Sequence, residues 1–314
     1  MNSLIDFSNC EQLNFLSYNG GNGSKIGINY DGTAYMLKFP PYNDKANIYT
    51  NSCISEYISC HIFQMLGFET QDTILGIYNK NGEEKKVVAC KDFTMNKLQK
   101  EKELHDFASI KNTIIENSLS NGYGTELNDV IETILNQNIL PENEMLEHFW
   151  NMFIVDSLLG NFDRHNGNWG FLIDLKTHEI SFAPIYDCGS CLYPQLSDEQ
   201  MKEYLNNEDE INKRIYVFPN SALKINDRKI NYYDFINSLQ NEDCNNALLR
   251  IYTRINLNEI KEFIDNVPLI SDTRKTFYKT MIESRLEKIL EPAFTKIEQL
   301  EQNNNTESDD EEEM

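Results

Sequence analysis

The spacing of apolar residues changes partway along this 314-residue chain, and the change limits which folds the chain can adopt. Near the N-terminus, Lys25–Phe39 alternates apolar and polar residues around Asp31-Gly32, which predicts a β-hairpin with a two-residue turn. Two further strand-like runs, Thr73–Tyr78 and Lys86–Cys90, flank Asn81-Gly82. These runs predict one antiparallel sheet.

Helical spacing appears once within this first region and then dominates the rest of the chain. Over Ser52–Leu66 the apolar residues recur every three or four positions and stop at Gly67, which predicts a helix. Beyond about Asp106, similar spacing recurs in two segments, and Ser181–Tyr186 is a short strand-like run. The two helical series are Met145, Phe149, Phe153 and Leu158, on one helix face, and Phe277, Met281, Leu286 and Ile289.

The predicted fold class is therefore α+β with two lobes. Residues 1–95 would form a small lobe with an antiparallel sheet and one helix, and residues 96–301 a larger, mostly helical lobe. The acidic tail 302–314 has almost no apolar residues to offset the entropy of ordering it, so we expect it to be disordered.

Composition excludes several classes of function. A formal net charge of −22, with scattered lysines and arginines, argues against a direct nucleic-acid ligand. No apolar run is long enough to span a bilayer, and the N-terminus lacks a signal-peptide pattern, so we expect a cytoplasmic protein. The seven cysteines are expected to be reduced, and Cys188-x-x-Cys191 is interpreted as two buried thiols because a zinc site needs four ligands.

The run NFDRHNGNWGF contains the most informative polar residues. Asp163 and Asn168 stand five positions apart on a Gly-containing loop, and Asp187 follows the strand-like run Ser181–Tyr186. Phosphoryl transfer requires a carboxylate to orient the attacking hydroxyl and oxygen ligands to hold Mg²⁺. Asp163 would be the base, and Asn168 and Asp187 the metal ligands. Each alone could be a turn or cap residue, but the three together favour this chemistry.

Residues that could hold a nucleotide lie upstream of this run. Lys38 ends a predicted strand, where it could neutralise phosphates if Glu56 held it in place, although each of them taken alone is more often a solvated surface residue. The glycine cluster 19–24 would let backbone amides approach phosphates closely, with Lys25 adding charge. Its candidate binding residues are Gly21, Gly23, Ser24 and Lys25.

Together these residues resemble the HipA-like Ser/Thr kinase family, and the chain is most similar to its CtkA-type, cell-translocating members. The resemblance implies a protein-kinase-like bilobal fold and an ATP- and Mg²⁺-dependent kinase. It implies that Asp163 is the catalytic base, that Asn168 and Asp187 bind Mg²⁺, and that Lys38 contacts ATP with Glu56 as its partner. The glycine cluster and Cys188 differ from the corresponding motifs of ordinary protein kinases.

The same resemblance implies further roles. Residues 88–93 would form the hinge, where backbone groups near Lys91 and Phe93 meet adenine, and His165 would lie near the phosphates or hydrogen-bond the loop. Phosphorylation of Ser17 or Ser24 would switch the enzyme off. Family members include toxins paired with antitoxins and kinases that act in host cells, so an antitoxin or host-protein partner, and delivery without a cleaved signal peptide, are also implied.

Two other functions stay open at this stage. The D-R-H-x-x-N pattern also resembles lipid-kinase loops, so the acceptor could be a phosphoinositide or small molecule, although the acidic chain favours a protein acceptor. Alternatively, the protein could be a catalytically silent kinase-like module. Retention of Asp163, Asn168 and Asp187 argues against the silent module. Arg164 is interpreted as an internal salt-bridge partner.

Overall fold

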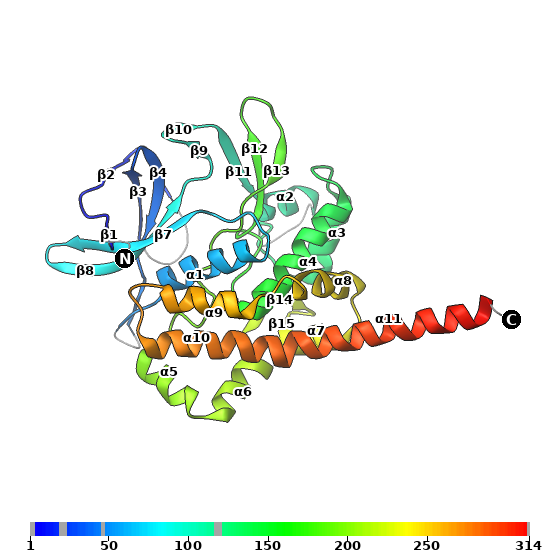
Figure 1. The fold of residues 1–314 in the computed structure, drawn as a ribbon. Coiled ribbons are helices and arrows are strands. Elements are labelled where there is room, and N and C mark those ends of the chain that lie inside the picture. The colour runs from blue at the N-terminus through cyan, green and yellow to red at the C-terminus, as the bar shows by residue number, and fades with distance from the viewer. Residues whose placement is uncertain (1–3, 19–23, 45–47, 116–120, 313–314) are drawn as a thin grey trace.

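The computed structural model describes residues 4–18, 24–44, 48–115 and 121–312. A sheet-rich N-terminal lobe and a larger helical lobe lie side by side, with the long helix α11 projecting away from both (Figure 1). The predicted α+β bilobal architecture is confirmed. Among the described residues, no helix is both long and apolar enough to cross a membrane.

The N-terminal lobe is built on a six-stranded sheet with the order β1-β7-β8-β4-β3-β2. Only the β1–β7 pair is parallel. Both predicted two-residue turns are present, because Asp31, Gly32, Asn81 and Gly82 all adopt positive φ, as hairpin turns of this kind require. The strands are β1 (Ile5–Asp6), β2 (Glu11–Gln12), β3 (Lys25–Tyr30), β4 (Thr33–Lys38), β7 (Thr73–Lys80) and β8 (Glu83–Lys91).

Helix α1 (Ser52–Met65), which the sequence predicts, packs against β7 and β8. It is buried on more than one face, since Glu56 is only 1% exposed. A short hairpin of β5 (Tyr42–Asn43) and β6 (Ile48–Tyr49) precedes it. Burial of Glu56 inside the protein requires a charged partner, and Lys38 supplies it.

The C-terminal lobe is organised around α4 (Glu142–Leu159). We predicted one apolar face for this helix, but from Phe149 to Leu159 every residue is buried, because other elements pack around it on all sides. The other helices of this lobe are α2 (Phe107–Ile114), α3 (Leu127–Asn136), α5 (Asp198–Leu205), α6 (Glu208–Tyr216), α7 (Tyr232–Ser238), α8 (Glu242–Tyr252), α9 (Leu257–Asn266), α10 (Asp272–Arg285), the π-helix η1 (Leu286–Leu290) and α11 (Glu291–Glu312).

Short strands complete the C-terminal lobe and its border with the sheet lobe. The predicted strand Ser181–Tyr186 is shorter than expected: the strand itself ends at Phe182, before Pro184, and Ile185 pairs with Thr70 in an isolated bridge. The remaining strands are β9 (Met95–Asn96), β10 (Gln99–Lys100), β11 (Lys102–Asp106), β12 (Gly170–Asp174), β13 (Ile180–Phe182), β14 (Asn220–Ile225) and β15 (Arg228–Asn231).

Backbone hydrogen bonds join the two lobes. The amide of Gln71 donates to the carbonyl of Ile185 over 2.9 Å, and the amide of Asn51 donates to the carbonyl of Pro194 over 2.8 Å. The segment that leads into Asp187 is therefore attached to the N-terminal lobe. These bonds fix Asp187 relative to the sheet.

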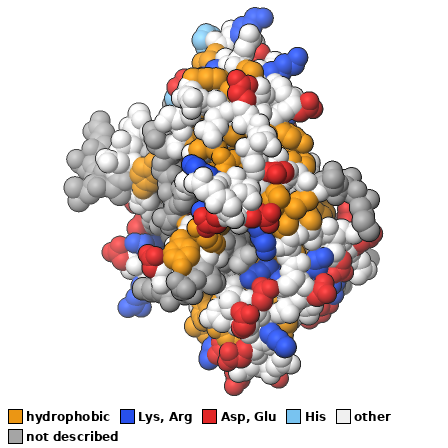
Figure 2. Space-filling model, turned by 90° about the vertical axis from the view of Figure 1, so that its left-hand side faces the viewer, with side chains coloured by type: hydrophobic (Ala, Val, Ile, Leu, Met, Phe, Trp, Pro, Cys, Tyr) orange, Lys and Arg blue, Asp and Glu red, His pale blue; other side chains and the backbone are white. Residues whose placement is uncertain are grey.

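The surface and the tail complete the description of the fold. Basic and acidic side chains are intermingled on the face shown in Figure 2, in agreement with the absence of a basic stripe in the sequence. Helix α11 continues to Glu312, through the segment for which the sequence predicts disorder. The lobe boundary at residue 95 and the disorder of the tail stay predictions.

Candidate active site

Asp163 and Asn168 lie on the loop that follows α4. Gly160, in the left-handed conformation, ends the helix. The side-chain amide of Asn168 donates to the carbonyl of Asp163 over 2.8 Å. This bond uses the amide nitrogen and leaves the side-chain oxygen as an acceptor. Asn168 is buried, whereas Asp163 is exposed, so its carboxylate is available to a substrate.

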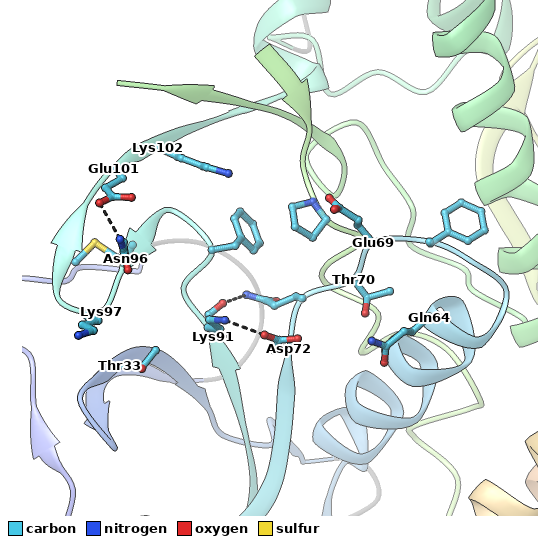
Figure 3. Close-up of a pocket in the computed structure, with 15 residues that line it drawn as sticks. Thr33, Gln64, Glu69, Thr70, Asp72, Lys91, Asn96, Lys97, Glu101 and Lys102 are labelled. Carbon is cyan, nitrogen blue, oxygen red and sulfur yellow. Dashed lines mark hydrogen bonds and ion pairs between the residues drawn. The ribbon is translucent and has the colours of Figure 1, made fainter. Parts of the chain in front are cut away.

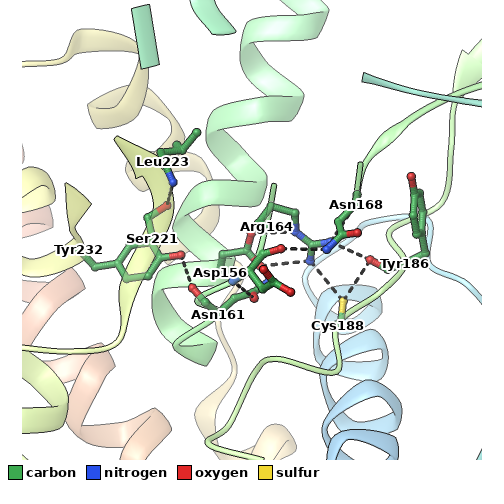
Figure 4. A network of polar contacts seen from close by, with 10 residues as sticks. Asp156, Asn161, Arg164, Asn168, Tyr186, Cys188, Ser221, Leu223 and Tyr232 are labelled. Carbon is green, nitrogen blue, oxygen red and sulfur yellow. Dashed lines mark hydrogen bonds and ion pairs between the residues drawn. The ribbon is translucent and has the colours of Figure 1, made fainter. Parts of the chain in front are cut away.

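Arg164 joins this loop to the loop that carries Asp187 (Figure 4). Its guanidinium pairs with Asp156 of α4 at 3.0 Å and donates to the carbonyls of Asn168 and Tyr186 at 2.9 and 2.7 Å. Both residues of the ion pair are buried, so its geometry is well defined. The prediction that Arg164 is an internal salt-bridge partner is confirmed.

Lys38 lies between two carboxylates from different elements. Its ammonium group is 3.1 Å from Glu56 Oε2 on α1 and 3.0 Å from Asp187 Oδ1. Burial opposes the charge of Lys38, but Asp187 and Glu56 together raise its pKa well above the usual value. Lys38 in turn lowers the pKa of Asp187 to about 2, whereas burial raises the pKa of Glu56. Asp187 is therefore a carboxylate at neutral pH.

Two cavities meet at this cluster. The larger, of about 630 Å³, lies between the lobes, and the smaller, of about 310 Å³, lies beside it. Both are lined by Lys25, Lys38, His165 and Asp187. Asn168 lines only the larger cavity, with Phe93 and Ser17, whereas Asp163 lines only the smaller, with Ser24 and Glu56.

The hinge presents free backbone groups at only one of the two predicted positions. Among hydrogen bonds between described residues, neither the N–H nor the C=O of Phe93 has a partner. The carbonyl of Lys91 instead accepts a bond from Gln71 Nε2 at 3.0 Å, and Lys91 Nζ pairs with Asp72 at 3.0 Å. Lys91 lines a neighbouring hollow of about 640 Å³ (Figure 3), whereas Phe93 lines both this hollow and the larger cavity. Phe93 is thus better placed than Lys91 to meet a base.

His165 has features of both roles considered for it. Its Nδ1 accepts a hydrogen bond from the Gly167 amide at 3.0 Å, and its ring also lines both cavities. The loop bond fixes the imidazole while leaving its other edge beside the cavities. Gly21 and Gly23, also predicted to contact nucleotide, fall outside the described residues.

Sequence reasoning missed two residues beside the larger cavity. Tyr18 donates its hydroxyl to Asp92 at 2.7 Å, and Asp92 also accepts bonds from Thr94, so the hinge is tied to the start of the glycine segment. Gln71 lines the cavity and holds the carbonyl of Lys91. No local motif marks either residue, because their partners lie far away in the chain.

The cysteines behave as the sequence predicts. Cys188 and Cys191 are free and buried. The sulfur of Cys188 accepts a hydrogen bond from Arg164 at 3.3 Å. Among the residues described by the structure, no three His, Cys, Asp or Glu side chains form a metal site.

Comparison with known proteins agrees with this geometry. The HipA-like C-terminal domain matches residues 17–266, which is most of the chain. The chain belongs to the HipA-like family. It is 50% identical over 299 residues to the serine/threonine-protein kinase CtkA of Helicobacter pylori, covering 94% of this chain and 89% of that protein. With half of the residues shared over both chains, this HipA-like protein is a serine/threonine-protein kinase.

Solved structures place the fold in the same family. The crystal structure of the Helicobacter pylori proinflammatory kinase CtkA superposes with a TM-score of 0.88 at 50% identity, covering 95% of this chain and 98% of that chain. HipA of Shewanella oneidensis, solved with HipB and operator DNA, has a TM-score of 0.56 at 15% identity and covers 88% of this chain and 68% of that one. The latter shares the HipA-like fold alone.

Proposed function

We propose that this HipA-like protein transfers the γ-phosphoryl group of ATP, with Mg²⁺, to a serine or threonine of a protein. ATP occupies the larger cavity, with its base at Phe93 and its phosphates at Lys25, Lys38 and His165. Asp163 accepts the proton of the acceptor hydroxyl. The observation that carries the proposal is the division of the cavities: Asn168 lines the nucleotide side, Asp163 the other side, and Asp187 both.

The residues at this boundary fit Mg²⁺. The metal prefers hard oxygen ligands and usually keeps several waters, so one carboxylate and one amide oxygen are sufficient beside phosphate oxygens. Lys38 lowers the pKa of Asp187, which keeps it a carboxylate, and the amide nitrogen of Asn168 donates to the Asp163 carbonyl, which leaves Oδ1 of Asn168 as the ligand atom. Bound Mg²⁺ would neutralise charge on the phosphates.

Lys38 and Glu56 act as a positioning pair for this reaction. Glu56 is buried, and its Oε2 holds the ammonium of Lys38 together with Asp187. A fixed cation stabilises developing phosphate charge without reorganisation at the moment of transfer. Lys38 also contacts Asp187, so the phosphate-binding cation and the metal-binding carboxylate are placed together.

Autophosphorylation is a proposal within the same reaction. Ser24 lines the cavity that contains Asp163, whereas Ser17 lines the nucleotide cavity. A hydroxyl on the side of the base is the better-placed acceptor, which favours Ser24. Mapping of phosphosites by mass spectrometry after incubation with MgATP distinguishes the two serines.

The base assignment is tested with Asp163→Asn, which keeps the side-chain shape and removes the proton acceptor. We expect phosphate incorporation from labelled ATP to fall about 10²- to 10⁴-fold, with unchanged Tm and MgATP affinity. Asp209→Asn, an exposed change at the start of α6, is the matched control and should retain full activity. Wild-type incorporation by Asp163→Asn would show that another group is the base.

A further inference from the structure

The smaller cavity forms a chamber in front of Asp163. We call it the acceptor chamber, and its non-catalytic walls include Pro41, Thr50, Ser52, Ser190, Pro194 and Gln195. The first three come from the N-terminal lobe and the last three from the loop after Asp187. Its volume of about 310 Å³ is at the lower end for a ligand site, so it admits an acceptor residue and its immediate neighbours only.

Backbone hydrogen bonds hold these walls in place. The amide of Thr50 donates to the carbonyl of Pro41 over 2.9 Å, and the amide of Asn51 donates to the carbonyl of Pro194 over 2.8 Å. The second bond crosses from one lobe to the other. The chamber is therefore a built feature of the fold, with rigid prolines on both sides.

Carboxylates outnumber cations among the residues that line the chamber. Among the described lining residues, the carboxylates are Glu56, Asp163 and Asp187, and the cations are Lys25 and Lys38. Lys38 is already held by Glu56 and Asp187, and Lys25 contacts the phosphates of ATP in the function proposed above. The remaining walls are the imidazole of His165 and hydroxyl, thiol, amide and apolar groups. An anionic group entering beside Asp163 would meet a like charge and would lose its hydration without gaining a cationic partner.

We propose that the acceptor chamber selects an extended peptide segment whose residues beside the acceptor hydroxyl are uncharged or basic, and that it excludes anionic acceptors. Excluded are acidic or phosphorylated flanking residues and phosphoinositide headgroups. This proposal rests on the kinase function proposed above and specifies its substrate class. A phosphoinositide kinase would instead need several cations around the acceptor.

The first experiment measures phosphorylation of a peptide library with one central serine and every residue in turn at the positions immediately before and after it. We expect incorporation with Asp, Glu or phosphoserine to be lower by about fivefold or more than with Ala or Gly. Vesicles containing phosphatidylinositol phosphates should accept no phosphate. Equal incorporation with acidic and neutral flanks, or transfer to the vesicles, overturns the proposal. Absence of transfer to any peptide or to the protein itself counts instead against the kinase function.

The second experiment adds a cation to the chamber. Gln195 is exposed at the rim, so Gln195→Lys should be tolerated and should raise incorporation into acidic-flanked peptides relative to neutral ones by about threefold. Gln240→Lys makes the same change of net charge on an exposed residue that does not line the chamber, and should leave the ratio unchanged. An unchanged ratio in Gln195→Lys, or an equal rise in Gln240→Lys, contradicts the assignment of the chamber.

Discussion

Lys38 Nζ lies 3.0 Å from Asp187 Oδ1, although the two residues are separated by 149 positions and belong to opposite lobes. This ion pair connects the sheet that carries the lysine proposed to bind phosphate with the loop that carries the carboxylate proposed to bind Mg²⁺. The site is therefore assembled from residues of both lobes. Substitution of either residue should affect nucleotide binding and lobe geometry together.

Lys38→Met tests this connection. Methionine keeps the length of the side chain but removes the ammonium, so kcat/KM for ATP should fall about 10²-fold. The pKa of Asp187 should rise toward its usual value, because Lys38 is the main cause of its depression. Steady-state kinetics and calorimetry with MgATP provide the measurement. Lys213→Met, at an exposed position on α6, should match wild type, and equal losses in both variants would contradict the role of Lys38.

Arg164→Met should destabilise the fold as well as stop catalysis. The substitution leaves Asp156 buried without its cation, which typically costs about 3–5 kcal/mol of unfolding free energy. Lys213→Ala breaks an exposed pair with Glu210 and should cost less than about 1 kcal/mol. Urea denaturation at pH 7.5 compares them. A small loss for Arg164→Met would mean that Asp156 is neutral in the fold.

His148 should make stability depend on pH. It stacks on Phe182 with ring centroids 4.0 Å apart, and burial, with Arg164 nearby, lowers its pKa to about 4. The unfolded chain binds this proton at higher pH than the folded chain does. Protonation of His148 therefore leaves the unfolding free energy unchanged above about pH 6.5 and lowers it as the pH falls toward 4. His148→Phe should remove about 2 kcal/mol of the decrease in unfolding free energy between pH 7.5 and pH 5.

The measurement for His148 is the difference in unfolding free energy between His148→Phe and wild type at pH 7.5 and pH 5. Other groups titrate in both proteins and cancel in this comparison. Substitution of the exposed His178 by Asn is the control, and its pH profile should follow wild type. A difference between His148→Phe and wild type that is the same at both pH values would show that burial does not suppress protonation of His148.

The sequence by itself predicted the elements whose signals are local. The turns at Asp31-Gly32 and Asn81-Gly82 and the helix α1 depend on neighbouring residues, and each is present in the structure. The spacing of Asp163 and Asn168 is local in the same sense, since both lie on one loop. A strand could be predicted before Asp187, but the sequence did not show that it ends at Phe182. Pro184 follows that end, and Ile185 pairs with Thr70 instead of extending the strand.

The tertiary structure alone decided which residues share a cavity. Asp163 lines the smaller cavity and Asn168 the larger one, although they are five positions apart, because the loop turns between them. Gln71 and Tyr18 take their roles from Lys91 and Asp92, which are distant in sequence. Periodicity and turn chemistry act between near neighbours in the chain, whereas burial, ion pairing and cavity walls depend on which distant segments pack together.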